Sequence, residues 1–190
     1  MKNGFPKSRF GKATVMWLCC MALGAWVSSC ATKQVRPGLE QYRPRNADEM
    51  RVVQLMLELQ RALNAADAAG VLSIYSRDAG IMMDLTGERI GVLLTKEEYA
   101  PKLVGKMGKP SFKNCSYLFK FLEPTEFFLD ENDAVMTLPL EVDGTRCDYR
   151  EKAVFSFEFV KTPLGWRIGK STWEVLESTH PKFKGPGKNR

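Results

Sequence analysis

The stretch from Asn46 to Leu63 shows apolar residues at intervals of three and four, the spacing of an amphipathic helix. Asn46 can cap this helix, while the side chain of Glu49, three residues on, is placed to bind the amide of the cap residue. The apolar stripe consists of Val52, Leu55, Met56, Leu59 and Leu63. The pattern therefore predicts a helix that packs one face on a core.

Two further helices are predicted before about residue 108. Asp67 is placed to cap a second, short helix, and Thr95 with Glu98 forms a capping box for a third helix that runs to about Met107. Between these helices, residues 81–85 are short and apolar enough for a strand.

From Ser111 onward the apolar spacing changes to two, which is typical of β-strands. The alternating apolar residues are Tyr117, Phe119, Phe121, Met136, Leu138, Leu140, Ala153, Phe155, Phe157 and Phe159. Asp143-Gly144 predicts a two-residue hairpin, and Pro163-Leu164-Gly165 predicts the next turn. Three helices followed by about four long antiparallel strands indicate an α+β domain over residues 47–177, with the helices on one bent sheet.

The two turns set the expected strand registers. The turn at Asp143-Gly144 pairs Met136 with Glu151, and the following turn pairs Phe155 with Lys170. Glu151 and Lys170 then share the face of the aromatic residues, where charged side chains would line a cavity. A bulge that shifts the register would turn both outward, and the two interpretations stay open.

The first thirty residues have the features of an export signal. Four basic residues and no acidic one precede an apolar run at residues 13–27, which at 15 residues is shorter than the roughly 20 needed to span a bilayer. Val27-Ser28-Ser29-Cys30 follows, and it resembles the lipobox of bacterial lipoproteins. The resemblance implies a signal peptide at 1–29, acylation at Cys30 and a tether over 30–46. A secretory signal with a coincidental cysteine is the alternative.

The same resemblance has consequences for location. Two or more acyl chains are needed for stable anchoring, and lipoprotein processing supplies them at the thiol and at the new amino terminus. Ala31 stands where an inner-membrane retention signal would carry Asp. We therefore expect a periplasm-facing protein anchored in the outer membrane.

The distribution of charge argues against a nucleic-acid partner. The whole chain has a net charge of +6, but residues 47–180 contain 16 Lys and Arg against 21 Asp and Glu. The excess of positive charge belongs to the N-terminal segments and to the basic tail at 178–190. The body is acidic and offers no basic surface for nucleic acid.

Histidine and cysteine chemistry is restricted by number and position. His180 is the only histidine and lies in the basic tail, so histidine-dependent catalysis, a transition-metal site and a cofactor are not expected. Cys115 and Cys147 would meet an oxidising compartment. However, pairing Leu129 with Ala134 places the two cysteines about 26 Å apart along the strands, well beyond the roughly 7 Å that a disulfide allows. No disulfide is expected.

Residues 62–67 and 71–79, together with Gly165-Trp166-Arg167-Ile168, resemble polyketide-cyclase-like (SnoaL-like) members of the nuclear transport factor 2 superfamily. The resemblance covers roughly residues 47–177. It implies a cone in which helices close over a strongly bent sheet and leave a pocket at the wide end. The superfamily includes isomerases, dehydratases and cyclases as well as non-catalytic binding or dimerisation domains, so the fold alone does not decide the activity.

Six residues are candidates for lining such a pocket: Tyr75, Asp84, Tyr117, Tyr149, Glu151 and Lys170. Ordinary packing or turn formation is the alternative for each. The leading hypothesis is a lipid-anchored domain that binds a small apolar ligand or a protein partner without catalysis. A carboxylate-dependent isomerase or dehydratase that uses Glu151, and a module that forms homodimers, are the alternatives.

Overall fold

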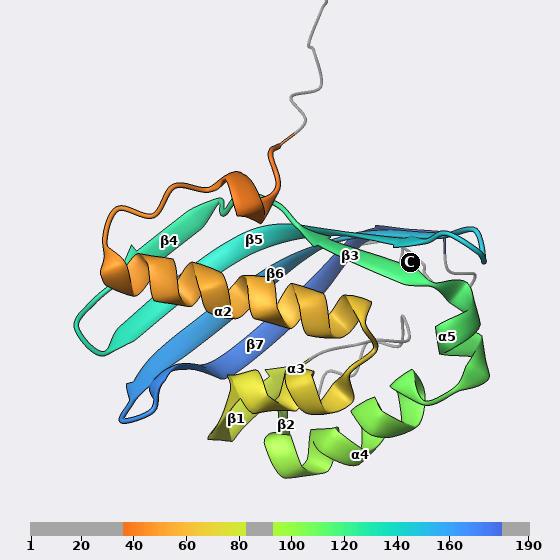
Figure 1. The fold of residues 1–190 in the computed structure, drawn as a ribbon, viewed down its shortest axis with the longest axis horizontal. Coiled ribbons are helices and arrows are strands. Elements are labelled where there is room, and N and C mark those ends of the chain that lie inside the picture. The colour runs from red at the N-terminus through yellow and green to blue at the C-terminus, as the bar shows by residue number, and fades with distance from the viewer. Residues whose placement is uncertain (1–35, 83–92, 180–190) are drawn as a thin grey trace, which may run out of the picture. The chain divides into compact units, whose positions relative to one another are not determined.

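The computed structural model describes residues 36–82 and 93–179, so the predictions for the signal peptide, Cys30, Asp84 and His180 lie outside the described residues. The described part is an α+β domain built on one curved, open sheet (Figure 1). The predicted fold class is confirmed.

Seven strands form the sheet in the order β2-β1-β7-β6-β5-β3, with β4 also paired to β5. β1 runs parallel to β7, and the other pairs are antiparallel. The strands are β1 (Tyr75–Met82), β2 (Leu94–Thr95), β3 (Tyr117–Phe121), β4 (Glu126–Leu129), β5 (Asp133–Gly144), β6 (Tyr149–Thr162) and β7 (Gly165–Ser178).

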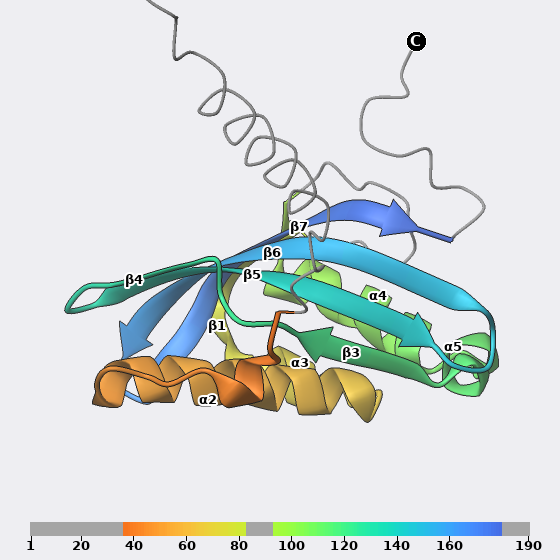
Figure 2. The same cartoon turned by 90° about the horizontal axis from the view of Figure 1, so that it is seen from above.

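The helices gather on one face of this sheet, as Figure 2 shows. They are η2 (Leu39–Gln41), α2 (Ala47–Asn64), α3 (Ala68–Ile74), α4 (Lys96–Met107) and α5 (Pro110–Cys115). The side chains of Asn46, Asp67 and Thr95 cap α2, α3 and α4 as predicted. Glu49 departs from the prediction, because its carboxylate accepts the amide of Arg45 at 2.6 Å instead of that of Asn46.

Aromatic side chains line the helix-facing side of the sheet. Phe155 and Phe157 are stacked with ring centroids 5.0 Å apart, and the Phe121 ring stands edge-on to both. Phe159 is also fully buried. This alternation of inward-facing residues is what the period of two predicted.

Both predicted registers are wrong. β5 continues through Asp143-Gly144, and residues 145–148 form the turn, with Asp148 in the left-handed region at φ 50°. Glu151 therefore pairs with Val142. On the other side of β6, an irregularity at Phe159 shifts the register, so that Lys170 pairs with Glu158.

Two element boundaries also differ from the predictions. The predicted strand at 81–85 begins earlier, because β1 starts at Tyr75 directly after α3. Residues 110–115 form α5 instead of the start of a strand. Pro110 explains this difference, because its fixed φ is suited to the first position of a helix.

Residues 36–45, which we call the arm, were predicted to be part of a tether, but they lie on the domain. Leu39 is fully buried, and Gly38 forms a bridge with Leu122 beside β3. The Glu123 amide donates to the Pro37 carbonyl at 2.9 Å. The folded domain therefore begins at about Arg36, and Figure 1 shows the arm in orange leading into the N-terminal end of α2.

The edge strand β3 is covered by side chains of α2. The Phe119 amide donates to Asn64 Oδ1 at 2.6 Å, and Asn64 Nδ2 donates to the Phe119 carbonyl at 3.1 Å. The Phe121 amide donates to Gln60 Oε1 at 2.6 Å. These bonds occupy the edge that would otherwise offer free backbone groups to another chain.

Candidate functional site

The candidate site is a rim cluster of Tyr117, Tyr149, Glu151 and Ser178, where β3, β6 and β7 reach the same end of the sheet. Tyr117 and Tyr149 pair with Gly144 from its two sides, and their rings meet edge-to-face at 5.3 Å. Glu151 pairs with Ser178 on β7. Three of the predicted residues, Tyr117, Tyr149 and Glu151, are thus brought together.

A hydrogen bond joins the acidic and phenolic groups of the cluster. The Tyr149 hydroxyl donates to Glu151 Oε2, and it also bonds the Ser178 side chain. Glu151 is only 3% exposed, whereas its sequence neighbours are more open: Arg150 is exposed and Lys152 is partly exposed. The carboxylate therefore sits on the interior side of β6, in phase with Ala153 and Phe155.

The electrostatics of the cluster keep the phenols protonated. Burial raises the pKa of Tyr149, and the hydrogen bond to Glu151 and the charge of that carboxylate raise it further. Burial and the charge of Glu151 also raise the pKa of Tyr117. The cluster can therefore supply a carboxylate acceptor whose position is set by a phenolic donor.

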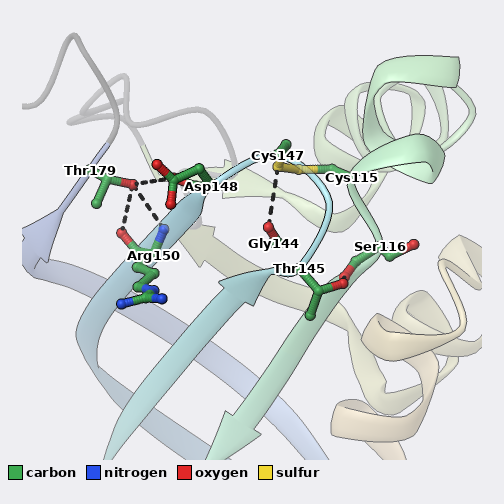
Figure 3. Close-up of a disulfide and its surroundings, with 8 residues drawn as sticks. All are labelled: Cys115, Ser116, Gly144, Thr145, Cys147, Asp148, Arg150 and Thr179. Atoms are coloured by element: carbon green, nitrogen blue, oxygen red, sulfur yellow. Dashed lines mark hydrogen bonds between the residues drawn. A yellow bond between two sulfur atoms is a disulfide. The ribbon is translucent and has the colours of Figure 1, made fainter.

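A disulfide joins Cys115 and Cys147 (Figure 3). It lies next to Gly144, which pairs with Tyr117 and Tyr149 of the rim cluster. The expectation of separate cysteines is wrong, because it placed Cys147 within a strand and carried one register through Pro124. Leu129 does pair with Ala134, but Leu140 pairs with Phe121, and Cys147 lies in the turn after β5. The Cα atoms of the two cysteines are 5.1 Å apart.

The disulfide joins α5 to the turn between β5 and β6. Two further bonds support the junction: the Arg146 amide donates to the Cys115 carbonyl at 3.2 Å, and Thr145 Oγ1 donates to the Ser116 carbonyl at 3.4 Å. The turn itself is tied to the end of β7, since the Arg150 amide donates to Thr179 Oγ1 at 2.9 Å (Figure 3).

Gly144 makes room for both the disulfide and the tyrosines. A Cβ atom there would lie 2.7 Å from Cys147 Sγ, 2.9 Å from Cys115 Sγ and 2.9 Å from the Cβ of Tyr149. The sequence pattern predicts Gly144 in a two-residue hairpin turn. Its role in the structure is close packing at the end of β5.

The other predicted pocket residues lie elsewhere. Tyr75 is in the core, where its hydroxyl lies 3.2 Å from Ser171 Oγ, and burial raises its pKa to about 12. Lys170 faces outward and forms an ion pair with Glu158 at 2.6 Å. The strand irregularity at Phe159 is what turned Lys170 away from the interior.

Trp173 is a partly buried residue on the interior face of β7 that the sequence patterns did not single out. It pairs with Phe155, and the two rings stack at 5.0 Å. Its indole Nε1 is buried and finds no hydrogen-bond acceptor among the described residues. A buried donor without an acceptor is costly, so such a group suggests a bound partner. In the sequence, the only indication that Trp173 faces the interior is its alternation with Ser171 and Val175 along β7.

A groove of about 630 Å³ opens beside the rim cluster. Glu151 and Ser178 line it, together with residues of both charges on the outer side of the sheet, which include Lys120, Glu141, Arg150, Lys152 and Glu177. Lys152 and Glu177 form an ion pair at 2.6 Å. The mixed charges favour no ligand of a single sign.

Metal binding and membrane spanning find no support in the part of the chain that the structure describes. Residues 36–82 and 93–179 contain no group of three or more His, Cys, Asp or Glu side chains that could hold a metal ion. Within the same residues, no helix is both long and apolar enough to cross a bilayer.

Solved structures with the same arrangement of helices and sheet place this fold among known ones. A protein assigned as a scytalone dehydratase from Novosphingobium aromaticivorans matches with a TM-score of 0.57 at 13% identity, over 69% of this chain and 85% of its own. An NTF2-like protein of unknown function from Pseudomonas putida matches with a TM-score of 0.51 at 14% identity, over 66% and 84%. The chain has the nuclear transport factor 2-like fold.

A third match shows that proteins with this fold are assigned different functions. A protein assigned as a ketosteroid isomerase from Shewanella frigidimarina matches with a TM-score of 0.52 at 16% identity, over 65% of this chain and 94% of its own. No protein-family model and no curated protein sequence matches the chain. At these identities the likeness is one of fold, and function has to be argued from the site.

Proposed function

We propose that this protein is an exported, lipid-anchored domain of the nuclear transport factor 2-like fold that binds a small apolar ligand carrying a hydrogen-bond acceptor. The observation that carries the binding role is the buried indole N–H of Trp173, which lacks an acceptor among the described residues and lies against Phe155. A carbonyl or ether oxygen of a flat apolar molecule would satisfy this donor while its rings stack on the aromatic wall.

Export is supported by two separate features, and anchoring by the first of them. The Val27-Ser28-Ser29-Cys30 segment resembles a lipobox, and the Cys115–Cys147 disulfide suits an oxidising compartment. The proposed site of action is the periplasmic face of the outer membrane. Replacing Cys30 with Ala should move the protein from the membrane fraction to the soluble fraction, and unchanged fractionation would argue against the anchor.

The ligand site can be tested with α-tetralone, a flat ketone, and with tetralin, the matched hydrocarbon without the acceptor. After removal of residues 1–29, the only indoles are those of Trp166 and Trp173. In NMR spectra of the ¹⁵N-Trp protein, α-tetralone should shift the Trp173 indole N–H signal at lower concentrations than tetralin does. Trp166 is the internal control, because its indole already donates to Asp48 at 3.0 Å.

The same probe measures affinity. A hydrogen bond of about 0.5–1.5 kcal/mol corresponds to roughly twofold to tenfold tighter binding of α-tetralone than of tetralin. The preference should disappear in Trp173→Phe. Equal binding of the two compounds by the unmodified protein, or no binding of either, would contradict the proposed site.

A second function, proton transfer, is favoured by one observation: the buried Glu151 carboxylate accepts a hydrogen bond from the Tyr149 hydroxyl. Such a carboxylate could remove a proton next to a ketone, as an isomerase or dehydratase requires. Exchange of the α-protons of α-tetralone in D₂O tests this function. Catalysed exchange that falls roughly 100-fold or more in Glu151→Gln would support the enzymatic function. Exchange at the buffer rate would argue against catalysis and leave ligand binding as the proposed function.

A further inference from the structure

The chain between the proposed lipid anchor and the folded domain is short. Only the five residues 31–35 separate Cys30 from Arg36. An extended chain advances at most 3.3–3.6 Å per residue, so Arg36 lies no more than about 22 Å from Cys30 in any conformation. A tether of this length keeps the start of the domain close to the membrane surface.

The arm is fixed to one edge of the sheet, so the tether is attached to the domain at that edge. Pro37, Gly38 and Leu39 are bound to the segment after β3 by the hydrogen bond, the bridge and the burial described above. Further along the arm, the ring of Tyr42 contacts that of Phe127 at 6.1 Å. The edge that carries the arm is therefore the part of the domain to which the tether is attached.

β4 lies on the same edge and exposes an aromatic side chain there. β3 and β4 pair with the same side of β5, and β1 and β2 lie at the opposite edge of the sheet. Phe127 faces the arm, so its neighbour Phe128 faces away, and it is 69% exposed. Its direct partner on β5, Val135, is 39% exposed.

Phe128 lies within reach of the anchored end. The Leu122 amide, beside the arm, donates to the Pro139 carbonyl, and Phe128 pairs with Val135, four residues away on β5. Four residues of strand span about 13 Å, less than the length of the tether. The exposed charges at this edge are of both signs, Arg36 and Arg43 on the arm against Glu40, Glu126 and Asp130, so the contact rests on the apolar Phe128–Val135 pair and not on charge.

We propose that the edge formed by the arm and β4 lies against the membrane, with Phe128 at the boundary between headgroups and acyl chains. This inference rests on the proposed anchoring at Cys30. It gives the exposed Phe128–Val135 pair a partner, a lipid surface, and places the opposite edge with β1 and α4 away from the membrane.

Site-specific quenching tests the orientation in the acylated protein. In a Phe128→Cys variant the new thiol is the only free one, because Cys30 is acylated, Cys115 is bonded to Cys147, and Cys19 and Cys20 leave with the signal peptide. The thiol is labelled with bimane in vesicles of phosphatidylethanolamine and phosphatidylglycerol that contain doxyl lipids. Val104→Cys on α4, where Val104 is 56% exposed, is the matched control.

Quenching should be severalfold stronger at position 128 than at position 104. Equal quenching at the two positions, or none at 128, in protein whose acyl chains are verified by mass spectrometry would overturn the orientation and leave the anchor intact. Protein that carries no acyl chain would overturn both.

A lengthened tether separates the role of its length from that of the surface. Insertion of about 20 Gly and Ser residues between Val35 and Arg36 allows a mean end-to-end distance of roughly 25 Å and far longer extensions. Quenching at position 128 should fall severalfold while the protein stays in the membrane fraction. Unchanged quenching would show that tether length does not orient the domain and would overturn the inference as stated.

Discussion

At the scale of single residues, Gly144 illustrates how one missing side chain allows several contacts. Its neighbours are both sulfur atoms of the disulfide and the Cβ of Tyr149, all closer than 3.0 Å to the place of a Cβ. Because these neighbours are held by a covalent bond and by strand pairing, they have little freedom to move away.

We expect Gly144→Ala to hinder formation of the Cys115–Cys147 bond and to lower the stability of the domain by up to about 3–4 kcal/mol, the contribution expected for a disulfide that closes a loop of this length. Free-thiol titration and urea unfolding would measure both effects. Gly105→Ala in α4 is the control, because a Cβ there has open space, and it should be neutral or stabilising. A fully oxidised, equally stable Gly144→Ala protein would refute the packing argument.

Asp48 is a second residue whose contacts make a prediction. The Trp166 indole N–H and the Lys161 ammonium, at 3.0 and 3.1 Å from its two oxygens, lower the pKa of Asp48 below its usual 3.8. A lowered folded-state pKa means that the charged form stabilises the fold above the unfolded-state value, and that this contribution is lost as the pH falls through the folded-state value.

Asp48→Asn should therefore be less stable than the unmodified protein at pH 7, and the difference should shrink below about pH 3.8. Urea unfolding at several pH values measures the difference. Asp78→Asn, at an exposed position on β1, serves as the comparison and should not reproduce the effect. A difference for Asp48→Asn that is constant with pH would rule out the charge as its cause.

The residues of the candidate site show why side-chain direction is more predictable than pairing. Glu151 was expected opposite Met136 and lies opposite Val142. The error is six residues, an even number, so the predicted face of the sheet is correct. Lys170 was expected opposite Phe155 and lies opposite Glu158. That error is three residues, an odd number, and the side chain points to the other face.

At the scale of elements, α2 both covers the core and closes an edge of the sheet. Its apolar stripe packs inward, while Asn64 and Gln60 bond the backbone of β3. A sequence shows the stripe and the N-terminal cap, because both are local patterns. It does not show which strand the polar residues of the helix will meet.

Asn64→Ala and Gln60→Ala should each lower the free energy of unfolding by about 1–3 kcal/mol, because each leaves a β3 amide without its partner. Hydrogen exchange of the Phe119 and Phe121 amides should become faster in the corresponding variant. Glu58→Ala, at an exposed position of the same helix, is the control. Unchanged exchange at both amides would show that solvent or another group replaces the side chains.

The elements that the sequence did not reveal share a physical feature. α5 is six residues long and has no side-chain cap, so its only local signal is Pro110. The arm has one buried apolar residue, Leu39, among prolines and charges, and no periodicity can arise from a single residue. Both elements owe their conformation to the surface on which they lie, and a local pattern does not describe that surface.

At the scale of the whole molecule, the arm decides where the domain begins. If it is part of the fold, truncating its buried residue should be costly: Leu39→Ala should lower the free energy of unfolding by about 2–5 kcal/mol. Leu164→Ala is the control, since Leu164 is 84% exposed in the turn before β7 and its truncation should cost less than about 0.5 kcal/mol. Similar small effects for both, measured by urea unfolding, would show that the arm is a free tether.

Mass spectrometry of the native protein taken from its own membranes tests export and anchoring together. We expect a chain that begins at Cys30 with acyl groups on its thiol and amino group, and a peptide in which Cys115 is bonded to Cys147. A chain that begins with the unprocessed residues before Cys30, carries no acyl group and has both body cysteines reduced would contradict export, anchoring and the membrane-facing edge together.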